Sequence, residues 1–178
     1  MRSTFYTLLL LAAGYLSGYA QNSGKNIFDI ARSGSITELN TLTEKDPKAI
    51  NEIDSRGYTA LILACYRGNI PVAMYLIDHA DNINHVSSQG TALATMTVHY
   101  NKDLTLKLLE KGANANLADQ NGETPLFLAV KSGNEELVRI LLDHKADVTI
   151  KDNQHKTVFE YAVESNNHTI INLLKNKK

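Results

Sequence analysis

NGETPLFLAVKSGNEELVRILLDHKADVT, residues 121–149, predicts two short amphipathic helices joined by a turn. Thr124 is suited to cap the first helix with its hydroxyl, and Pro125 suits the first helical position, where no N–H is needed. Apolar residues then recur at the spacing of one helical face. They are Leu126, Ala129 and Val130.

The second half of this stretch has its own start signal and its own apolar face. Gly133 can adopt the left-handed conformation that ends the first helix. Glu135 and Glu136 place negative charge at the start of the second helix, where the helix dipole favours it. The apolar face of that helix is formed by Leu137, Val138, Leu141 and Leu142. A pair of helices this short cannot bury both apolar faces alone, so we expect it to pack against similar neighbours.

The same pattern recurs along the chain at an almost constant period. The threonines that open the four clear copies are separated by 32, 33 and 33 residues. They are Thr59, Thr91, Thr124 and Thr157. An apolar pair follows in step in each second helix: Leu76-Ile77, Leu108-Leu109, Leu141-Leu142 and Leu173-Leu174. A weaker copy, NIFDIARSGSITELNTL at 26–42, precedes them with its turn glycine at Gly34.

A 33-residue period of turn, helix, turn and helix with a T-P-L-like start is similar to the ankyrin pattern. The chain therefore resembles the ankyrin-repeat family over about residues 24–178. This resemblance implies an all-α fold, an ankyrin-repeat solenoid of five helix–turn–helix repeats joined by short hairpin loops. We assign residues 21–178 to this domain, with repeats at about 24–56, 57–89, 90–121, 122–154 and 155–178.

The first 20 residues have the features of a secretory signal peptide. Arg2 gives a positive start, an apolar run follows, and Gly18 and Ala20 are the small residues that a cleavage site needs. The run is too short and too interrupted for a membrane span, which needs about 20 apolar residues. We expect a periplasmic or secreted protein with no stable membrane insertion after cleavage. An uncleaved amphipathic anchor is the alternative.

Composition and charge favour a single globular folding unit that does not bind nucleic acid. With 178 residues, 43% of them hydrophobic, and a formal net charge of −1, the chain suits one folding unit without a basic surface. The only long run of one charge is KNKK at residues 175–178, which is typical of a solvated tail, so we do not expect nucleic-acid binding. Cys65 is the single cysteine, which excludes an intramolecular disulfide and favours a buried thiol.

The third copy departs most from the others. Its loop at 85–90 is one residue short, Met96 replaces an alanine of the first helix, and Tyr100 stands where other copies have the turn glycine. A left-handed conformation costs a non-glycine residue roughly 1–2 kcal/mol. Tyr100 therefore either carries strain or forces a different turn, and the strain hypothesis predicts that Tyr100→Gly raises thermal stability.

No catalytic motif is present, so we expect no enzyme activity and no cofactor. The chain has no G-x-S-x-G, no P-loop and no G-x-G-x-x-G, and its histidines lack metal-ligand spacing. His79 and His144 lie at equivalent positions two repeats apart, too far from each other to share a metal. We therefore predict no catalytic residue and no metal site.

The remaining possibility is binding through the concave face that stacked repeats create. By register with the ankyrin pattern, the exposed positions are at the hairpin tips and at the end of each first helix. They are Arg56, Tyr58, Tyr66, Arg67, Gln89, His99, Gln120, Asn121, Glu123, Lys131, Asn153 and Lys156. Because aromatic and arginine side chains dominate interface energetics, we place a hot spot at Arg56, Tyr58, Tyr66 and Arg67. The alternative is that these are ordinary solvated residues.

These observations favour an exported, non-enzymatic adaptor that binds another protein. The chain also resembles exported bacterial ankyrin proteins that act alongside a periplasmic catalase, which suggests a class of partner. A second hypothesis is a secreted effector or accessory protein that binds a metal or small molecule at His85 or His99 in the third repeat. A third is a purely structural envelope protein.

Overall fold

The structure is a computed structural model that describes residues 24–176, and this part of the chain is helical. It contains nine α-helices, two 3-10 helices and only isolated bridges in place of strands. The α-helices are α2 (Ile27–Ser33), α3 (Ile36–Lys45), α4 (Ala60–Arg67), α5 (Ile70–His79), α6 (Lys102–Glu110), α7 (Pro125–Lys131), α8 (Glu135–Asp143), α9 (Val158–Glu164) and α10 (His168–Lys175). The 3-10 helices are η1 (Pro47–Asn51) and η2 (Ala94–Thr97). The predicted all-α class is confirmed, whereas the predicted signal peptide lies outside the described residues.

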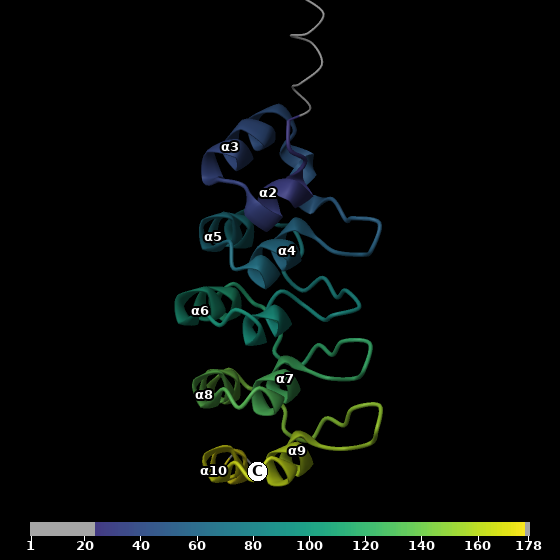
Figure 1. Ribbon diagram of the computed structural model, residues 1–178, viewed down its shortest axis with the longest axis vertical. Helices are drawn as coiled ribbons and strands as arrows, with labels where there is room; N and C mark the ends of the chain where they lie inside the picture. The colour runs from purple at the N-terminus through teal and green to yellow at the C-terminus, as the bar shows by residue number, and fades with distance from the viewer. Residues whose placement is uncertain (1–23, 177–178) are drawn as a thin grey trace, which may run out of the picture.

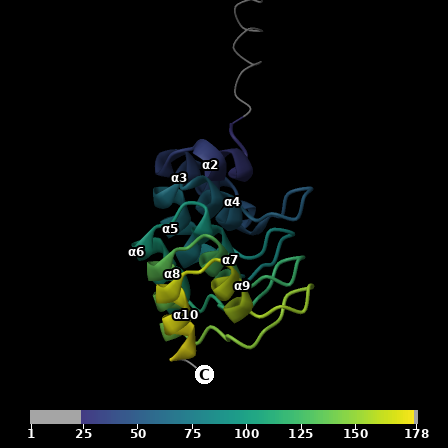
Figure 2. The same cartoon turned by 60° about the horizontal axis from the view of Figure 1, so that its bottom comes forward.

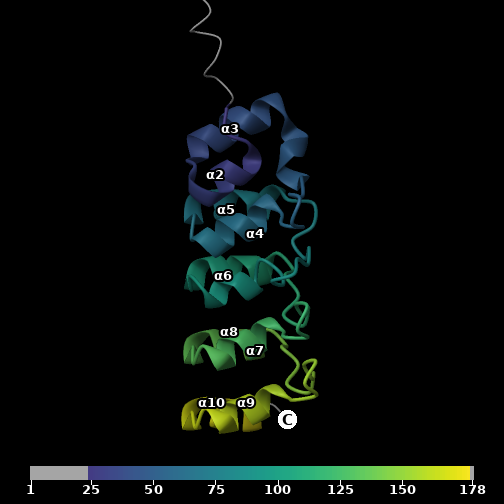
Figure 3. The same cartoon turned by 45° about the vertical axis from the view of Figure 1, so that its right-hand side comes forward.

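The helices form two stacked layers along the long axis of the molecule (Figure 1). In the inner layer α2 packs on α4, α4 and α7 pack on η2, and α7 packs on α9. In the outer layer α3 packs on α5, α5 on α6, and α8 on α10. The hairpin loops project from the inner layer to the same side in all views (Figures 1, 2 and 3). No helix in this described stack is long and apolar enough to cross a bilayer.

One continuous apolar core runs through the stack, because each helix pair covers the apolar faces of its neighbours. In α7, Leu126, Phe127 and Ala129 have no exposed surface, and in α8 Val138 and Leu141 have none. Burying one such leucine or phenylalanine side chain contributes roughly 1.5–3 kcal/mol. The predicted apolar faces of both helices are confirmed. Cys65 also lies in this core, and burial raises the pKa of its thiol to about 12.

Left-handed residues end the inner helices in three repeats. Gly68 and Gly133 have φ values of 69° and 70°, and Asn166 has 54°. Gly34 likewise ends α2 at the predicted turn position, but its φ of −86° is not left-handed. Glycine is needed there for a different reason: a Cβ at Gly34 would lie 2.6 Å from the Cα of Ile30.

An aspartate organises three of the four hairpin turns. One carboxylate oxygen accepts hydrogen bonds from the backbone N–H groups two and four residues later, at 2.8–3.0 Å. These residues are Asp54, Asp119 and Asp152. In the third repeat Ser87 replaces aspartate, and its hydroxyl accepts only the N–H of Gln89, at 3.2 Å. The expected one-residue shortening of that loop is confirmed, because Thr91 follows Gly90 directly.

Asparagine side chains connect neighbouring repeats. The Oδ1 atoms of Asn51, Asn84 and Asn116 accept backbone N–H groups of the following repeat at 2.9, 2.7 and 2.8 Å. Asn69 connects in the opposite direction, since its Nδ2 donates to the carbonyls of Ile30, Ala31 and Gly34. These bonds satisfy backbone groups at helix ends and loops, and they set the spacing between repeats.

The third repeat avoids strain by forming a different turn. Tyr100 is not among the described residues with positive φ, and its inner helix is reduced to the short 3-10 helix η2. The strain hypothesis for Tyr100 is therefore wrong, and the alternative of a different turn holds. Tyr100 packs against the core, and its hydroxyl is buried beside the carboxylate of Glu136. Burial, and then the carboxylate of Glu136, raise the pKa of Tyr100 to about 12.

The predicted caps are partly confirmed. At the start of α9 the carboxylate of Glu160 accepts the N–H of Thr157 at 2.6 Å, which is the backbone bond of a capping box, and it also accepts the Thr157 hydroxyl at 2.8 Å. Pro125 occupies the first turn of α7 as expected. Thr124 precedes it at the N-cap position, but its buried hydroxyl makes no hydrogen bond within the described part, so the predicted side-chain cap is wrong.

We predict that Tyr100→Gly lowers thermal stability. The substitution removes an aromatic side chain packed on the core and adds backbone entropy to the unfolded chain, which should cost about 2–4 kcal/mol of unfolding free energy. Chemical denaturation followed by circular dichroism measures this loss. An unchanged or higher stability would show that the packing of the Tyr100 side chain does not stabilise the third repeat.

We predict that Gly34→Ala lowers the unfolding free energy by about 1–3 kcal/mol, because the new methyl group would overlap the α2 backbone. Gly24→Ala is the matched control, since a Cβ there meets no atom within 4 Å. Equal denaturation midpoints for the two variants would contradict the close-approach explanation.

We predict that Asp152 makes folding stability sensitive to acid. Burial acts to raise the pKa of Asp152, but hydrogen bonds from Tyr161 and from backbone N–H groups outweigh it and hold the pKa below its usual value. A carboxyl with a lowered folded-state pKa stabilises the fold above its unfolded pKa, and that contribution is lost as pH falls. Asp152→Asn keeps the acceptor oxygen, so its unfolding free energy should fall less than that of the unmodified protein between about pH 5 and about pH 2. Parallel losses in both proteins would rule out this role.

Candidate functional site

The predicted binding residues lie on the hairpin loops and at the ends of the inner helices. Two positions recur on this face, one directly before the opening threonine and one seven residues after it. They hold Tyr58 and Tyr66 in the second repeat, Glu123 and Lys131 in the fourth, and Lys156 and Glu164 in the fifth. In the third repeat the first position is Gly90, which has no side chain, and Val98 occupies the second. The two residues of each pair are eight positions apart in the sequence, and we call them the face pairs.

In the fourth and fifth repeats the face pairs are ion pairs. Lys131 Nζ lies 2.6 Å from Glu123 Oε1, and Lys156 Nζ lies 2.6 Å from Glu164 Oε1. Glu123 is only 8% exposed, so its carboxylate depends on Lys131 for compensation. The lysines at this end of the face are therefore already paired with carboxylates of the same chain.

Tyr161 of α9 holds these two lysines together, and the sequence analysis missed it. The ring lies 5.2 Å from Lys131 Nζ and 5.3 Å from Lys156 Nζ, within cation–π range. Its hydroxyl donates to Asp152 Oδ2, and this bond, followed by burial, raises the pKa of Tyr161 to about 12. The sequence contains a signal for this role, because Tyr161 lies between the two face positions Lys156 and Glu164.

In the second repeat the face pair is aromatic and uncharged. Tyr66 is 43% exposed, and the Arg67 guanidinium carbon lies 6.0 Å from the centre of its ring. The Arg56 guanidinium carbon lies 5.3 Å from the ring of Tyr58, whose hydroxyl is 3.4 Å from Ser88 Oγ. Arg67 makes no ion pair with any residue in 24–176. This end of the face thus keeps exposed aromatic surface and an uncompensated cation.

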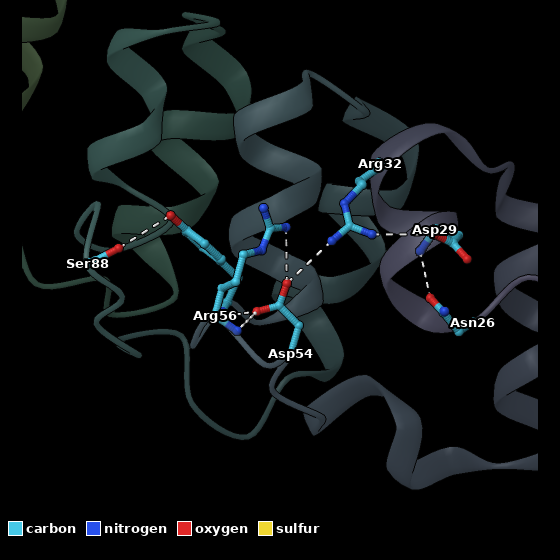
Figure 4. A network of polar contacts seen from close by, with 7 residues as sticks. Asn26, Asp29, Arg32, Asp54, Arg56 and Ser88 are labelled. Atoms are coloured by element: carbon cyan, nitrogen blue, oxygen red, sulfur yellow. Dashed lines mark hydrogen bonds and ion pairs between the residues drawn. The ribbon is translucent and has the colours of Figure 1, made fainter.

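The structure brings the predicted hot spot together around a small hollow of about 90 Å³. We call it the arginine hollow; its side chains include Arg32, Arg56, Tyr58, Tyr66, Arg67 and Gln89. Arg32 was not predicted, since it comes from α2 in the first repeat, where the face was not mapped. Figure 4 shows Arg32 and Arg56 converging on Asp54, whose Oδ2 lies 3.4 Å from a guanidinium nitrogen of each.

Asp54 remains a carboxylate at the edge of this hollow. Burial acts to raise its pKa, but hydrogen bonds from the N–H groups of Tyr58 and Arg56, and then the Arg56 side chain, bring the pKa below its usual value. Asp54 is therefore a negatively charged group that holds the guanidinium groups of Arg32 and Arg56 in place.

Other predicted residues serve the hairpins themselves. The N–H of Asn153 donates to the carbonyl of Asn121 at 3.0 Å, and its Nδ2 donates to the carbonyl of Gln120 at 3.0 Å. These three residues therefore join two adjacent hairpins. His99 lies beside Gly68 of the preceding repeat, at the same end of the face as Arg67.

The histidines have structural contacts. His85 Nε2 lies 2.9 Å from the carbonyl oxygen of Gly57. This contact connects the hairpins of the second and third repeats. His79 stacks on Tyr75 with ring centres 3.9 Å apart, and His144 Nδ1 lies 2.8 Å from the carbonyl oxygen of Ile140. Within the described ranges, no three His, Cys, Asp or Glu side chains are grouped as metal ligands.

Comparison with protein families matches a model of three ankyrin repeats to residues 27–119 and 93–178. The chain is 33% identical over 107 residues to ankyrin repeat and SAM domain-containing protein 6 of Rattus norvegicus, covering 59% of this chain and 12% of that protein. It is 32% identical over 111 residues to BCL-6 corepressor-like protein 1 of Homo sapiens, covering 61% and 6%. It is 26% identical over 129 residues to Rabankyrin-5 of Homo sapiens, covering 65% and 11%.

The chain spans only a small part of the length of these relatives. The family match, in contrast, extends over nearly all of the described stack. The chain therefore belongs to the ankyrin-repeat family.

Proposed function

We propose that this protein is a non-enzymatic adaptor that binds another protein through the second and third repeats of its concave face. The observation that carries this proposal is the contrast between the face pairs. Lys131 and Lys156 form ion pairs with glutamates of their own repeats. In the second repeat, by contrast, the Tyr66 ring is exposed and Arg67 has no ion-pair partner among the described residues. Exposed aromatic and arginine side chains of this kind are the usual energetic anchors of interfaces.

The equivalent position of the next repeat is also apolar and exposed. Val98 is 53% exposed and occupies the position equivalent to Tyr66. A protein partner could cover both side chains and remove apolar area from water. Ankyrin repeats generally mediate protein–protein interaction, which agrees with this role.

We further propose that the protein is exported to the periplasm or secreted, on the basis of the signal-peptide pattern in residues 1–20. A periplasmic enzyme such as catalase is then the first partner to test. The support for this partner is the resemblance to exported bacterial ankyrin proteins.

The alternative of a metal- or small-molecule-binding accessory protein or effector has less support. His85, one of its two candidate ligands, contacts the Gly57 carbonyl through Nε2. Metal analysis of the purified protein distinguishes the two functions, since stoichiometric metal that is lost in His99→Ala would favour the alternative.

We predict that Tyr66→Ala reduces capture of the partner at least about tenfold, as expected for an interface hot spot. The measurement is affinity capture from an envelope extract of the source cell with mass identification, followed by binding of the identified partner. Arg139→Ala in the outer helix α8 is the control, because it removes an exposed side chain away from the hairpins. Both variants should keep the circular dichroism spectrum of the unmodified protein. Full capture by Tyr66→Ala would place the interface elsewhere.

A further inference from the structure

We propose that the arginine hollow binds a carboxylate side chain from an extended acidic segment of the partner, with an apolar neighbour of that residue on Tyr66 and Val98. This inference rests on the proposed function and adds the chemistry of the partner.

The first argument is charge. Three arginines, Arg32, Arg56 and Arg67, line the hollow, and none of its lining residues is acidic. Asp54 at its edge is already fully engaged: Oδ1 accepts two backbone N–H groups, and Oδ2 contacts Arg32 and Arg56. Asp29, which pairs with Arg32 outside the hollow, and Asp54 together supply two negative charges against three guanidinium groups, so the hollow keeps a net positive charge that attracts a further anion.

The second argument is preorganisation. Arg32 is held between Asp29 and Asp54, each at 3.4 Å, and its side chain is only 27% exposed. Arg56 is held by Asp54 and the ring of Tyr58, yet its side chain is 62% exposed. Each guanidinium has five N–H donors in a planar fork that fits a carboxylate, so donors remain for a ligand. Binding therefore needs little additional ordering of these side chains.

The third argument is the size and isolation of the positive charge. A hollow of about 90 Å³ suits one side-chain group. The lysines farther along the face, Lys131 and Lys156, are already paired with glutamates. A nucleic acid needs several contacts to successive phosphates, and this face offers no such track. A single carboxylate beside an apolar residue fits both the local charge and the exposed surface of Tyr66 and Val98.

The test uses a fluorescein-labelled peptide of alternating Glu and Leu, flanked by Gly and Ser, with a matched peptide in which Gln replaces Glu. Fluorescence anisotropy with the purified protein should show binding of the Glu peptide at least about tenfold tighter than that of the Gln peptide. Arg67→Ala and Arg56→Ala should each weaken the Glu peptide about five- to tenfold. Arg139→Ala is the matched control and should leave the affinity unchanged. Added salt should weaken binding of the Glu peptide only.

Several results would overturn the proposal. These are no binding of the Glu peptide, equal binding of the Gln peptide, or full affinity in Arg67→Ala and Arg56→Ala proteins that remain folded. Tighter binding of a phosphoserine version of the peptide, or of oligothymidylate, would assign the hollow to another ligand.

A charge reversal separates this proposal from the proposed function. If Arg67→Glu captures the cellular partner normally while Tyr66→Ala does not, the adaptor function stands and the acidic ligand is excluded. If neither variant affects capture, the proposed binding face is itself wrong.

Discussion

The structure depends on the burial of apolar helix faces between successive repeats. Residues such as Phe127 and Leu141 have no exposed surface because their own helix pair and the adjacent ones cover them together. An isolated pair of helices of seven to ten residues would leave these faces in water and would be too short to be stable alone. Stability is therefore a property of neighbouring repeats, and the hairpin loops and inner-helix ends are left free to vary.

Polar side chains determine the spacing of the stack that apolar burial stabilises. Asparagines such as Asn84 and Asn116 satisfy backbone groups of the following repeat, and aspartates such as Asp119 close the hairpins. The third repeat lacks this aspartate and one loop residue, and its inner helix is only the 3-10 helix η2. The repeat still packs in both layers, which indicates that burial tolerates local departures from the hairpin pattern.

The repeat pattern of the sequence predicts the helices, their apolar faces and the left-handed ends at Gly68 and Gly133, because these features depend on residues within one repeat. It does not predict the close approach at Gly34, which depends on backbone geometry, and at Tyr100 it leaves strain and a different turn as alternatives, because the inner helix itself changes there. Arg32 was missed because it lies on α2 of the first repeat, where the face was not mapped from the repeat register. The pairing of Glu123 with Lys131 joins a hairpin to a helix end, so the rule for neighbours four residues apart along a helix does not apply to it.

If the proposed function holds, the face pairs would restrict recognition to one end of the face that carries them. At the C-terminal end a partner would have to separate Lys131 from Glu123 or Lys156 from Glu164 before using either charge, and it would lose existing hydrogen bonds in doing so. At the N-terminal end Asp54 positions two guanidinium groups without exhausting their donors, and Tyr66 presents apolar area at no such cost. The face pair of a repeat thus determines whether its charges are paired within the repeat, as in the fourth and fifth, or whether aromatic surface stays exposed, as at Tyr66 in the second.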